Sequence, residues 1–393
     1  MNDEASAAAM PVVFEERPAG DGRRIGIATL NAPRTLNGLS LAMAHLLDDR
    51  LQAWAADAGI ALVILQGAGE KAFCAGGDLQ ALYRSMREHQ AGGSSDIGDN
   101  RYASEFFQVE YRLDYRIHTY PKPLLCWGHG IVMGGGIGLM AGASHRVVSE
   151  RSKLAFPEIG IGLFPDVGGS WLLHRVPDRA GLFLALTGAP LGAGDAIHAG
   201  MADHYVPEAQ RAAVYEAIVL ADWSGDAAID RVRLSALLRG FAGRPDIGPL
   251  QRHRQWIADT DAQPDLQRVV ATILALDDED PWLANARQAL AAGAPGSMRL
   301  AYELQRRAAS ASLADVFRME YVVALHCAAH GDFAEGIRAL LIDKDRQPHW
   351  NPATLEQASA DWAEAFFALP WPSSAHPLAD LGTTSAFHGR THA

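Results

Sequence analysis

The sequence contains few cysteines: only Cys74, Cys126 and Cys327 occur in 393 residues. Their number is odd and their spacing is unlike that of metal ligands, so we expect reduced thiols in a reducing compartment. Long apolar runs are also missing, since none approaches the ~18 residues that a membrane span needs. The first ten residues carry early acidic side chains and resemble neither a secretion signal nor an Arg-rich transit peptide. We therefore expect a soluble cytoplasmic protein without a membrane partner, and the high content of Ala, Gly and Arg suggests a bacterial source.

Positive charge is in deficit as well. The 34 Lys and Arg residues against 46 Asp and Glu residues give a net charge of −12. This balance argues against a nucleic-acid partner, and a phosphorylated ligand would need a local basic patch. Four histidines, His118, His129, His145 and His174, lack H-x-x-x-H spacing, so no metal site is expected. The absence of a G-x-S-x-G elbow disfavours an α/β-hydrolase, and no Walker A or G-x-G-x-x-G run stands in a fitting context.

Strands, loops and helices alternate over the first half of the sequence. Apolar strands flank a turn near residues 19–22, and Ser40 can cap a helix that runs to about Ala56. Strands are expected at Val12–Glu16, Ile25–Leu30, Ala61–Leu65, Leu124–Trp127 and Arg146–Ser149, and helices at Tyr102–Thr119 and from Gly134. The alternation predicts an α/β fold with parallel strands and right-handed crossovers. Ligands in such folds bind at the loops beyond the carboxyl ends of the strands.

The second half reads as helix after helix. We expect helices at Glu208–Ala221, Arg231–Leu238, Asp265–Leu276 and Leu313–Ala329. The chain then divides into a catalytic core at residues 10–207, an α-helical region at 208–368 and a disordered or peripheral tail at 369–393. The small, polar, glycine-rich stretch Gln90–Asn100 predicts a mobile surface loop.

Two glycine-rich motifs carry the chemistry. They read FCAGGD at Phe73–Asp78 and HGIVMGGGIGL at His129–Leu139, and FPEIGIGLFPDVGG follows at Phe156–Gly169. A glycine lets a backbone N–H approach a ligand because no Cβ stands in the way. Two such N–H groups aimed at one carbonyl oxygen form an oxyanion hole, and the carboxylates Glu158 and Asp166 follow at once. The motifs predict chemistry on an acyl group.

Over residues 12–210 these motifs resemble the crotonase, or enoyl-CoA hydratase/isomerase, superfamily, whose pattern opens with LNAPRTLNGLS at Leu30–Ser40. The resemblance implies a crotonase-like fold of repeated ββα units with a helical C-terminal region. Within the superfamily the chain looks most like the 3-hydroxyisobutyryl-CoA hydrolases. The run GLFPDVGG at Gly162–Gly169, the pair Glu110 and Tyr111, and the stretch Gly331–Pro352 carry this narrower resemblance.

The resemblance also implies roles for individual residues. The N–H groups of Gly77 and Gly135 would hold the thioester oxyanion, and Gly135 would also open a helix. Glu158 would act on the carbonyl, either by direct attack, through an anhydride, or as general base toward water. Enoyl-CoA hydratases look to carry a second glutamate where this chain has Gly138, so efficient hydration is not expected.

Two further carboxylates are assigned by resemblance to the substrate. Asp166 would bind the substrate hydroxyl or orient the water, although it could also cap a helix from Val167 onward. Two neighbouring carboxylates raise one pKa, which favours a protonated donor beside an ionised base. Glu110 would contact the 3-hydroxyl and so discriminate against acyl groups that lack it.

The remaining candidates lie around the motifs. Arg34 is the best candidate for a CoA phosphate and Lys71 a weaker one. Gly134 and Asp78 are expected to line the substrate, whereas Cys74 resembles a small packing residue.

The leading hypothesis is therefore hydrolysis of a short 3-hydroxyacyl-CoA, most simply 3-hydroxyisobutyryl-CoA, with no cofactor beyond the CoA of the substrate. An enoyl-CoA isomerase or hydratase is the alternative enzyme, and a non-catalytic binding protein is a third hypothesis. Monomer, trimer and hexamer all stay open.

Overall fold

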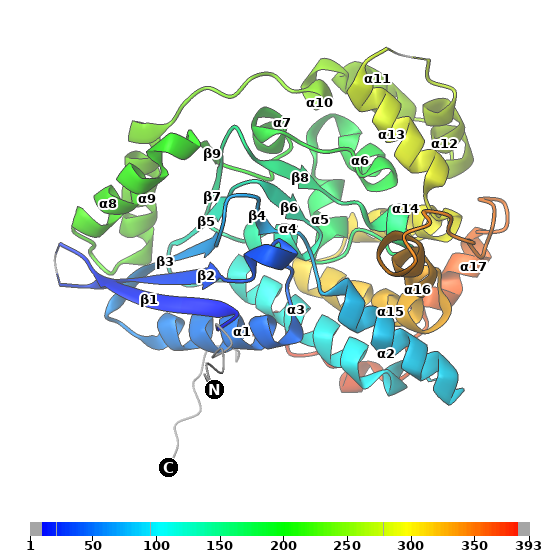
Figure 1. Ribbon diagram of the computed structural model, residues 1–393, viewed down its shortest axis with the longest axis horizontal. Coiled ribbons are helices and arrows are strands. Elements are labelled where there is room, and N and C mark those ends of the chain that lie inside the picture. Colours follow the sequence, from blue (N-terminus) through cyan, green and yellow to red (C-terminus); the bar gives the residue numbers. More distant parts are fainter. Residues whose placement is uncertain (1–9, 21, 95, 278, 384–393) are drawn as a thin grey trace, which may run out of the picture.

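The computed structural model describes residues 10–20, 22–94, 96–277 and 279–383 (Figure 1). Within these residues the larger sheet has six strands in the order β1-β2-β3-β5-β7-β9, in which the β1–β2 pair is antiparallel and the other pairs are parallel. A smaller sheet holds three parallel strands in the order β4-β6-β8. The strands are β1 (Val12–Pro18), β2 (Arg24–Leu30), β3 (Ile60–Gly67), β4 (Ala72–Cys74), β5 (Leu124–Gly128), β6 (Ile131–Met133), β7 (His145–Val148), β8 (Lys153–Ala155) and β9 (His204–Tyr205).

The two sheets share one repeating pattern. Along the chain, β3 is followed by β4, β5 by β6 and β7 by β8, and each pair leads into a helical segment. These segments are α2 (Leu79–Gly92), α4 (Gly135–Ala141) and the 3-10 turn Glu158–Ile161. The pattern confirms the expected α/β fold of ββα units. The short strands of the smaller sheet were not predicted, because each has only three residues and adjoins a glycine-rich loop.

Both faces of the larger sheet are covered. In β3, Val63 and Leu65 face the main core, whereas Leu62 and Ile64 face a second core closed by α8 (Arg211–Leu220) and α9 (Ala227–Phe241). Figure 1 shows α8 and α9 on the side of the sheet away from α1 (Leu41–Ala56). Burial on both faces explains why this strand is continuously apolar.

The predicted helices are confirmed with small shifts at their ends. Ser40 caps α1 by accepting the N–H of Met43, and the helix expected at Tyr102–Thr119 is α3 (Arg101–His118). The other helices are α5 (Gly169–His174), α6 (Ala180–Thr187), α7 (Ala193–His198), α10 (Pro249–Arg252), α11 (Arg254–Asp261), α12 (Leu266–Leu274), α13 (Pro281–Ala292), α14 (Pro295–Ala308), α15 (Leu313–His330), α16 (Phe333–Ile337) and α17 (Ala360–Glu364). No helix in the described ranges has the length and apolar character that a bilayer crossing requires.

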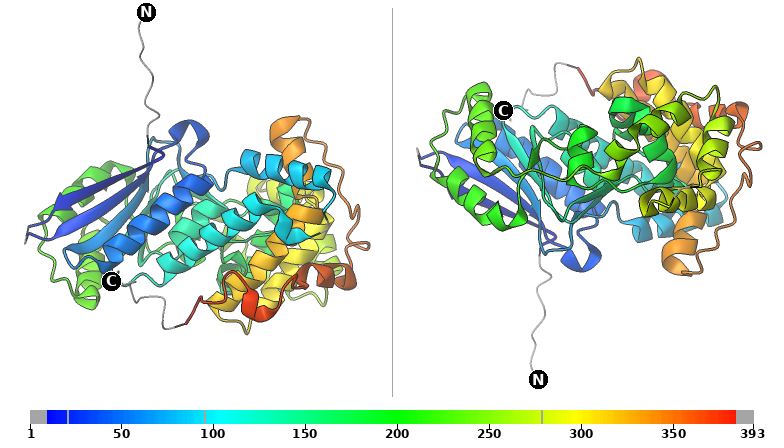
Figure 2. Two further views of the ribbon diagram at one scale, coloured as in Figure 1. Left: turned by 90° about the horizontal axis from the view of Figure 1, so that it is seen from below. Right: turned by 90° about the horizontal axis from the view of Figure 1, so that it is seen from above.

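The C-terminal helices pack directly on the elements that carry the motifs. Helix α15 lies against α2 and α3, and α16 lies against α2 and the Glu158–Ile161 turn. Figure 2 shows α16, in orange, beside the cyan α2. The C-terminal region therefore forms part of the wall around the glycine loops.

Two expectations about surface segments need correction. In the stretch Gln90–Asn100, α2 continues to Gly92 and Ile97 is buried in the main core, so this is not a free loop; residue 95 lies outside the described residues. The expected tail is peripheral and not disordered as far as residue 383: Leu378 and Leu381 are buried, and Arg112 pairs with Asp380 at 2.6 Å. Residues 384–393 lie outside the described ranges.

Candidate active site

The two glycine-rich loops and the acidic residues meet at one cavity of about 80 Å³. It lies between the ends of β4 and β6, helix α3 and α16. Its lining includes Gly76, Gly77, Gly134, Gly135, Phe106, Phe107, Glu110, Glu158, Ile161, Leu163, Asp166 and Phe333. The structure thus brings together six predicted site residues from four separate parts of the sequence. Phe106, Phe107 and Phe333 were not predicted; aromatic residues on helices are most often core residues.

The first loop is held by the segment Leu30–Ser40. The N–H of Leu39 donates to the carbonyl of Gly76 at 2.8 Å, and the N–H of Asp78 donates to the carbonyl of Leu39 at 2.9 Å. Asn37, fully buried, accepts the N–H of Ala32 and donates to two carbonyls on either side of the turn between β3 and β4. These bonds fix the backbone at Gly77.

The second loop places its glycines against carboxylates. Gly134 has φ of 49° and ψ of −122°, a conformation that favours glycine, and it precedes α4. A Cβ on Gly134 would lie 3.0 Å from Oε1 of Glu158, and one on Gly135 would lie 2.3 Å from Oε1 of Glu110. The Cβ added to Gly135 would also lie 3.6 Å from the backbone nitrogen of Gly77. Only glycines allow the two loops and both carboxylates to approach this closely.

Asp166 is held by a side chain from α3. Tyr111 donates its hydroxyl to Oδ2 of Asp166 at 2.7 Å, and both residues are buried. The possible role of Asp166 as a helix cap is wrong: α5 begins at Gly169, and the N–H groups of Gly168 and Ser170 donate to Glu320 instead. Glu320 was not predicted, because a glutamate on a helix is usually solvated.

Burial governs the protonation of these acids. It raises the pKa of Glu158 well above its ordinary value, and the charges of Asp166, Glu110 and Glu320 raise it further. Burial and the charge of Asp166 also raise the pKa of Glu110. Burial raises the pKa of Asp166 to about 6, although the hydrogen bond from Tyr111 opposes the shift. Because these acids are buried close together, they cannot all be ionised at once, and at least one proton stays within the cluster.

The space beside Gly138 is occupied by another acid. A Cβ on Gly138 would lie 2.6 Å from Oδ2 of Asp114, a buried residue of α3. No glutamate side chain fits at position 138 while Asp114 stays where it is. This agrees with the expectation that a second carboxylate from position 138 is missing, and it supplies the steric reason.

Three predicted ligand residues lie outside the cavity. Asp78 accepts the N–H of Ala81 at 3.0 Å and caps α2, although its neighbours Gly77 and Leu79 line the cavity. Arg34 and Lys71 line a separate cavity of about 570 Å³, together with Arg151. The substrate-contact role of Asp78 and the phosphate role of Arg34 remain predictions.

The thiol and imidazole groups near the motifs have structural partners. Cys74 is fully buried, burial raises its pKa to about 12, and its Sγ lies 3.7 Å from the carbonyl of Gly76, which fits the packing role predicted for it. Nε2 of His129 bonds to the carbonyl of Gly69 at 2.9 Å, and His145 bonds to α9. In the described part of the chain, no group of three or more His, Cys, Asp or Glu residues is placed to hold a metal ion.

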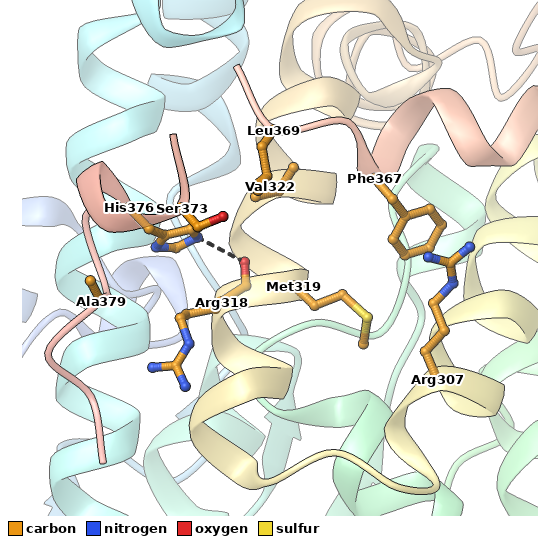
Figure 3. A pocket seen from close by; sticks show the side chains of 9 residues that line it. All are labelled: Arg307, Arg318, Met319, Val322, Phe367, Leu369, Ser373, His376 and Ala379. Carbon is orange, nitrogen blue, oxygen red and sulfur yellow. Dashed lines mark hydrogen bonds between the residues drawn. The ribbon is translucent and has the colours of Figure 1, made fainter. Parts of the chain in front are cut away.

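A larger cavity of about 520 Å³ lies elsewhere, between α14, α15 and the C-terminal segment (Figure 3). Arg307 covers the ring of Phe367 at 3.7 Å, and His376 bonds to the carbonyl of Arg318. None of the predicted site residues lines this cavity, so its size does not make it the active site.

Comparison with known proteins bears on the family. A model of the enoyl-CoA hydratase/isomerase family matches residues 25–367. The protein named "3-hydroxyisobutyryl-CoA hydrolase, mitochondrial" of Xenopus tropicalis is 35% identical over 342 residues, covering 87% of this chain and 86% of the relative. The proteins of that name from Gallus gallus and Homo sapiens are 36% and 33% identical, and cover 87% and 86% of this chain and 86% and 84% of their own length.

Two solved structures are similar over most of the chain. One is titled a carnitinyl-CoA dehydratase from Mycobacterium thermoresistibile, with a TM-score of 0.79, 37% identity and coverage of 91% of this chain and 96% of its own. The other is titled an enoyl-CoA hydratase from Rhodobacter sphaeroides 2.4.1, with a TM-score of 0.76, 35% identity and coverage of 91% and 97%.

Proposed function

Because the chain belongs to the enoyl-CoA hydratase/isomerase family, we propose that it hydrolyses the thioester of a short 3-hydroxyacyl-CoA. The proposed preferred substrate is 3-hydroxyisobutyryl-CoA, which would give the free acid and CoA, a step of valine degradation. The observation that carries the proposal is that Glu110, Glu158 and Asp166 line one small cavity with both glycine loops. The names of the relatives at 33–36% identity support the choice of reaction.

The two glycine loops would stabilise the charge that develops on the thioester oxygen. In the proposal, the N–H groups of Gly77 and Gly135 donate to that oxygen as the carbonyl carbon becomes tetrahedral. A Cβ added to Gly135 would lie 3.6 Å from the backbone nitrogen of Gly77, and this closeness of the two loops supports the role. Loss of one such donor typically costs ~10²–10³ in rate.

Glu158 would break the thioester by one of two routes. In the first, its carboxylate attacks the acyl carbon, the C–S bond breaks, and water then cleaves the mixed anhydride. In the second, Glu158 takes a proton from water, and the resulting hydroxide attacks the same carbon. In both routes the CoA thiolate leaves and takes up a proton. A buried carboxylate with a raised pKa is a stronger base, which favours either step once it is ionised.

The substrate hydroxyl would be recognised by acids on the cavity wall. Glu110 is proposed to accept the 3-hydroxyl, and Asp166, oriented by Tyr111, to bind the hydroxyl or orient the water. Phe106, Phe107 and Phe333 limit the space, which favours a short acyl chain. The CoA phosphates would meet the cavity lined by Arg34, Lys71 and Arg151, in which Glu70 already pairs with Arg151 at 3.4 Å.

The test is thiol release from 3-hydroxyisobutyryl-CoA, compared with crotonyl-CoA and methacrylyl-CoA. We expect rapid release from the hydroxy ester and a loss of about 10³-fold or more in Glu158→Gln. Labelled oxygen in Glu158 after a single turnover in heavy-oxygen water would establish the anhydride route, with water attacking the glutamyl carbonyl of the anhydride. Absence of thiol release from every ester would contradict the proposal.

The alternative is an enoyl-CoA hydratase or isomerase. The titles of the two similar solved structures favour it, whereas Gly138 and Asp114 argue against the second carboxylate that hydration needs. Conversion of crotonyl-CoA without free thiol would support this alternative.

Three further features belong to the proposal. We expect no cofactor beyond the CoA of the substrate, so dialysis against a chelator should leave thiol release unchanged. The protein can be a monomer, a trimer or a hexamer, and light scattering distinguishes these three oligomeric states. A cytoplasmic location is proposed although the relatives' names place them in mitochondria, and cell fractionation tests it.

A further inference from the structure

Asp114 is a buried acid that the proposed reaction does not use. It lies on α3, one helical turn after Glu110, with no exposed surface. Both of its carboxyl oxygens are buried without a hydrogen-bond partner among the described residues. Asp166, by contrast, accepts a hydrogen bond from Tyr111, and Glu320 accepts two from backbone N–H groups. Of these three acids, Asp114 is therefore the one with no donor toward either oxygen among the described residues.

The surroundings of Asp114 are apolar or acidic. It lies beside Gly138, which has no side chain. A Cβ added to Gly138 would lie 2.6 Å from Oδ2 of Asp114 and 2.8 Å from Cβ of Val167. Helix α4, which provides Gly138, has no ionisable side chain in its sequence GGIGLMA. The charges that act on Asp114 are those of Glu110 on α3, Asp166 before α5 and Glu320 on α15, all of the same sign.

The cations nearby are already paired. Arg116, on the same helix, pairs with Asp48 of α1 at 2.5 Å, and Arg112 pairs with Asp380. The thiol of Cys74, also within electrostatic range, is kept neutral by burial. An isolated carboxylate in such surroundings would lose its hydration without compensation, a cost that a protein avoids by leaving the group protonated.

We propose that Asp114 is the proton-holding residue of this acidic cluster: it stays a neutral carboxylic acid, and its lack of charge allows Glu110 and Asp166 to meet the substrate as anions. Acids at close range cannot all ionise, so a proton held at one position near neutral pH lowers the cost of ionising the others. Asp114 does not line the cavity, so it acts as a positioning residue through its neighbours.

The role has a consequence for the reaction. Once Asp114 loses its proton at alkaline pH, its new charge repels the carboxylates that bind the substrate hydroxyl. Substrate binding and turnover should then weaken together. This kinetic consequence rests on the proposed function, whereas the protonation state of Asp114 in the resting protein does not.

The first experiment is difference infrared spectroscopy of the whole protein without substrate, labelled with isotopic aspartate. We expect the carbonyl band of a protonated aspartic acid to persist about two pH units above the pKa values of about 6 that burial gives Asp166, Asp261 and Asp332. The band should vanish in Asp114→Asn. A matched control is Asp48→Asn. It replaces another aspartate, the ion-pair partner of Arg116, by asparagine and should leave the band in place.

The second experiment measures kcat/KM for 3-hydroxyisobutyryl-CoA against pH. In the wild type, kcat/KM should fall with the same midpoint at which the infrared band disappears, by about tenfold per pH unit. The fall should be absent in Asp114→Asn and present in Asp48→Asn. A band that persists over the whole folded range supports the proposal on its own.

Three results would overturn it: no protonated aspartate in the wild type at about two pH units above the pKa values of Asp166, Asp261 and Asp332, a band that survives in Asp114→Asn, or an alkaline fall that survives in that variant. If Asp114→Asn does not fold, the wild-type band and its shared midpoint with kcat/KM still decide the question. Failure of thiol release alone would refute the proposed function and leave the infrared result intact.

Discussion

Glu320 and Gly168 are joined by a hydrogen bond of 2.7 Å although they lie 152 residues apart in the chain. The second oxygen of Glu320 accepts the N–H of Ser170 at 3.0 Å. Gly168 and the preceding Val167 both have left-handed backbone conformations, with φ of 80° and 54°. Glu320 therefore stabilises the strained turn that follows Asp166, and the C-terminal helix α15 becomes part of the active site's support.

Glu320→Ala should weaken both the fold and the activity. It leaves two buried N–H groups without acceptors, each costing about 1–3 kcal/mol, so we expect the free energy of unfolding to fall by about 2–6 kcal/mol. Thiol release should fall about tenfold or more, because Asp166 loses its fixed position. Denaturant unfolding and the thiol assay measure the two effects. Glu364→Ala, which removes an exposed partner of Arg307, should cost under about 1 kcal/mol and serves as the control. Equal effects of the two variants would contradict the assigned role.

The pH dependence of stability should show the buried acid directly. Burial raises the pKa of Glu320 from an ordinary 4.5 to about 8. Between these values the unfolded chain has lost the proton while the folded protein keeps it, so Glu320 makes stability fall as pH rises. Buried histidines such as His118, with a pKa lowered to about 4, have the opposite effect below about pH 6.5. Between about pH 6.5 and 8, the effect of the buried acids on the free energy of unfolding can therefore be measured without the opposite effect of the histidines.

In that window the free energy of unfolding of the wild type should decrease with pH. The slope for Glu320→Gln should be smaller in magnitude by about 1.4 kcal/mol per pH unit, the contribution of one group. Denaturant unfolding at a series of pH values provides the measurement. Identical slopes in the two proteins would show that Glu320 is already ionised at neutral pH.

Gly138→Ala tests the packing between α4 and α3. The new Cβ would lie 2.6 Å from Oδ2 of Asp114 and 2.8 Å from Cβ of Val167, so we expect a loss of about 1–3 kcal/mol in unfolding free energy. The double variant with Asp114→Ala should recover part of this loss, giving a coupling energy of about 1 kcal/mol in a double-mutant cycle. Gly240→Ala, where the added Cβ meets nothing within 4 Å, should instead be neutral or slightly stabilising. Strict additivity of the two changes would mean that the residues do not compete for space.

The parts of the fold predictable from sequence are those set by local pattern. The apolar run inside β3 predicted a strand, because a strand buried on both faces is continuously apolar. Ser40 predicted the start of α1, because its hydroxyl accepts the N–H of Met43, which has no acceptor within the helix. The order of the two glycine motifs and the acids predicted that they share a site. They do share one, since the loops that carry them follow neighbouring parallel strands of the smaller sheet.

Residues whose role depends on tertiary packing were not predictable. Glu320 and Asp114 lie on helices whose sequences look amphipathic, where an acid is ordinarily exposed. Their burial follows only from the packing of α15 and α4 against α3. The same reason explains the tail: the residues around Leu378 are polar and proline-rich, and this leucine is buried only because its segment packs on α15, where Arg318 donates to its carbonyl at 3.2 Å.

Glu110→Gln should change substrate preference more than it changes chemistry. If Glu110 accepts the 3-hydroxyl, the variant loses a charge-assisted hydrogen bond of about 1.5–3 kcal/mol, or roughly 10- to 100-fold in kcat/KM for 3-hydroxyisobutyryl-CoA. Isobutyryl-CoA, which lacks the hydroxyl, should lose less than about threefold, because the thioester contacts at Glu158 are retained. Parallel thiol-release assays on the two esters measure the ratio. Glu105→Gln, on the exposed face of the same helix where it pairs with His45 at 3.0 Å, should alter neither ester. Equal losses on both esters in Glu110→Gln would place this acid at the thioester instead, since only a group that contacts the hydroxyl can distinguish the two substrates.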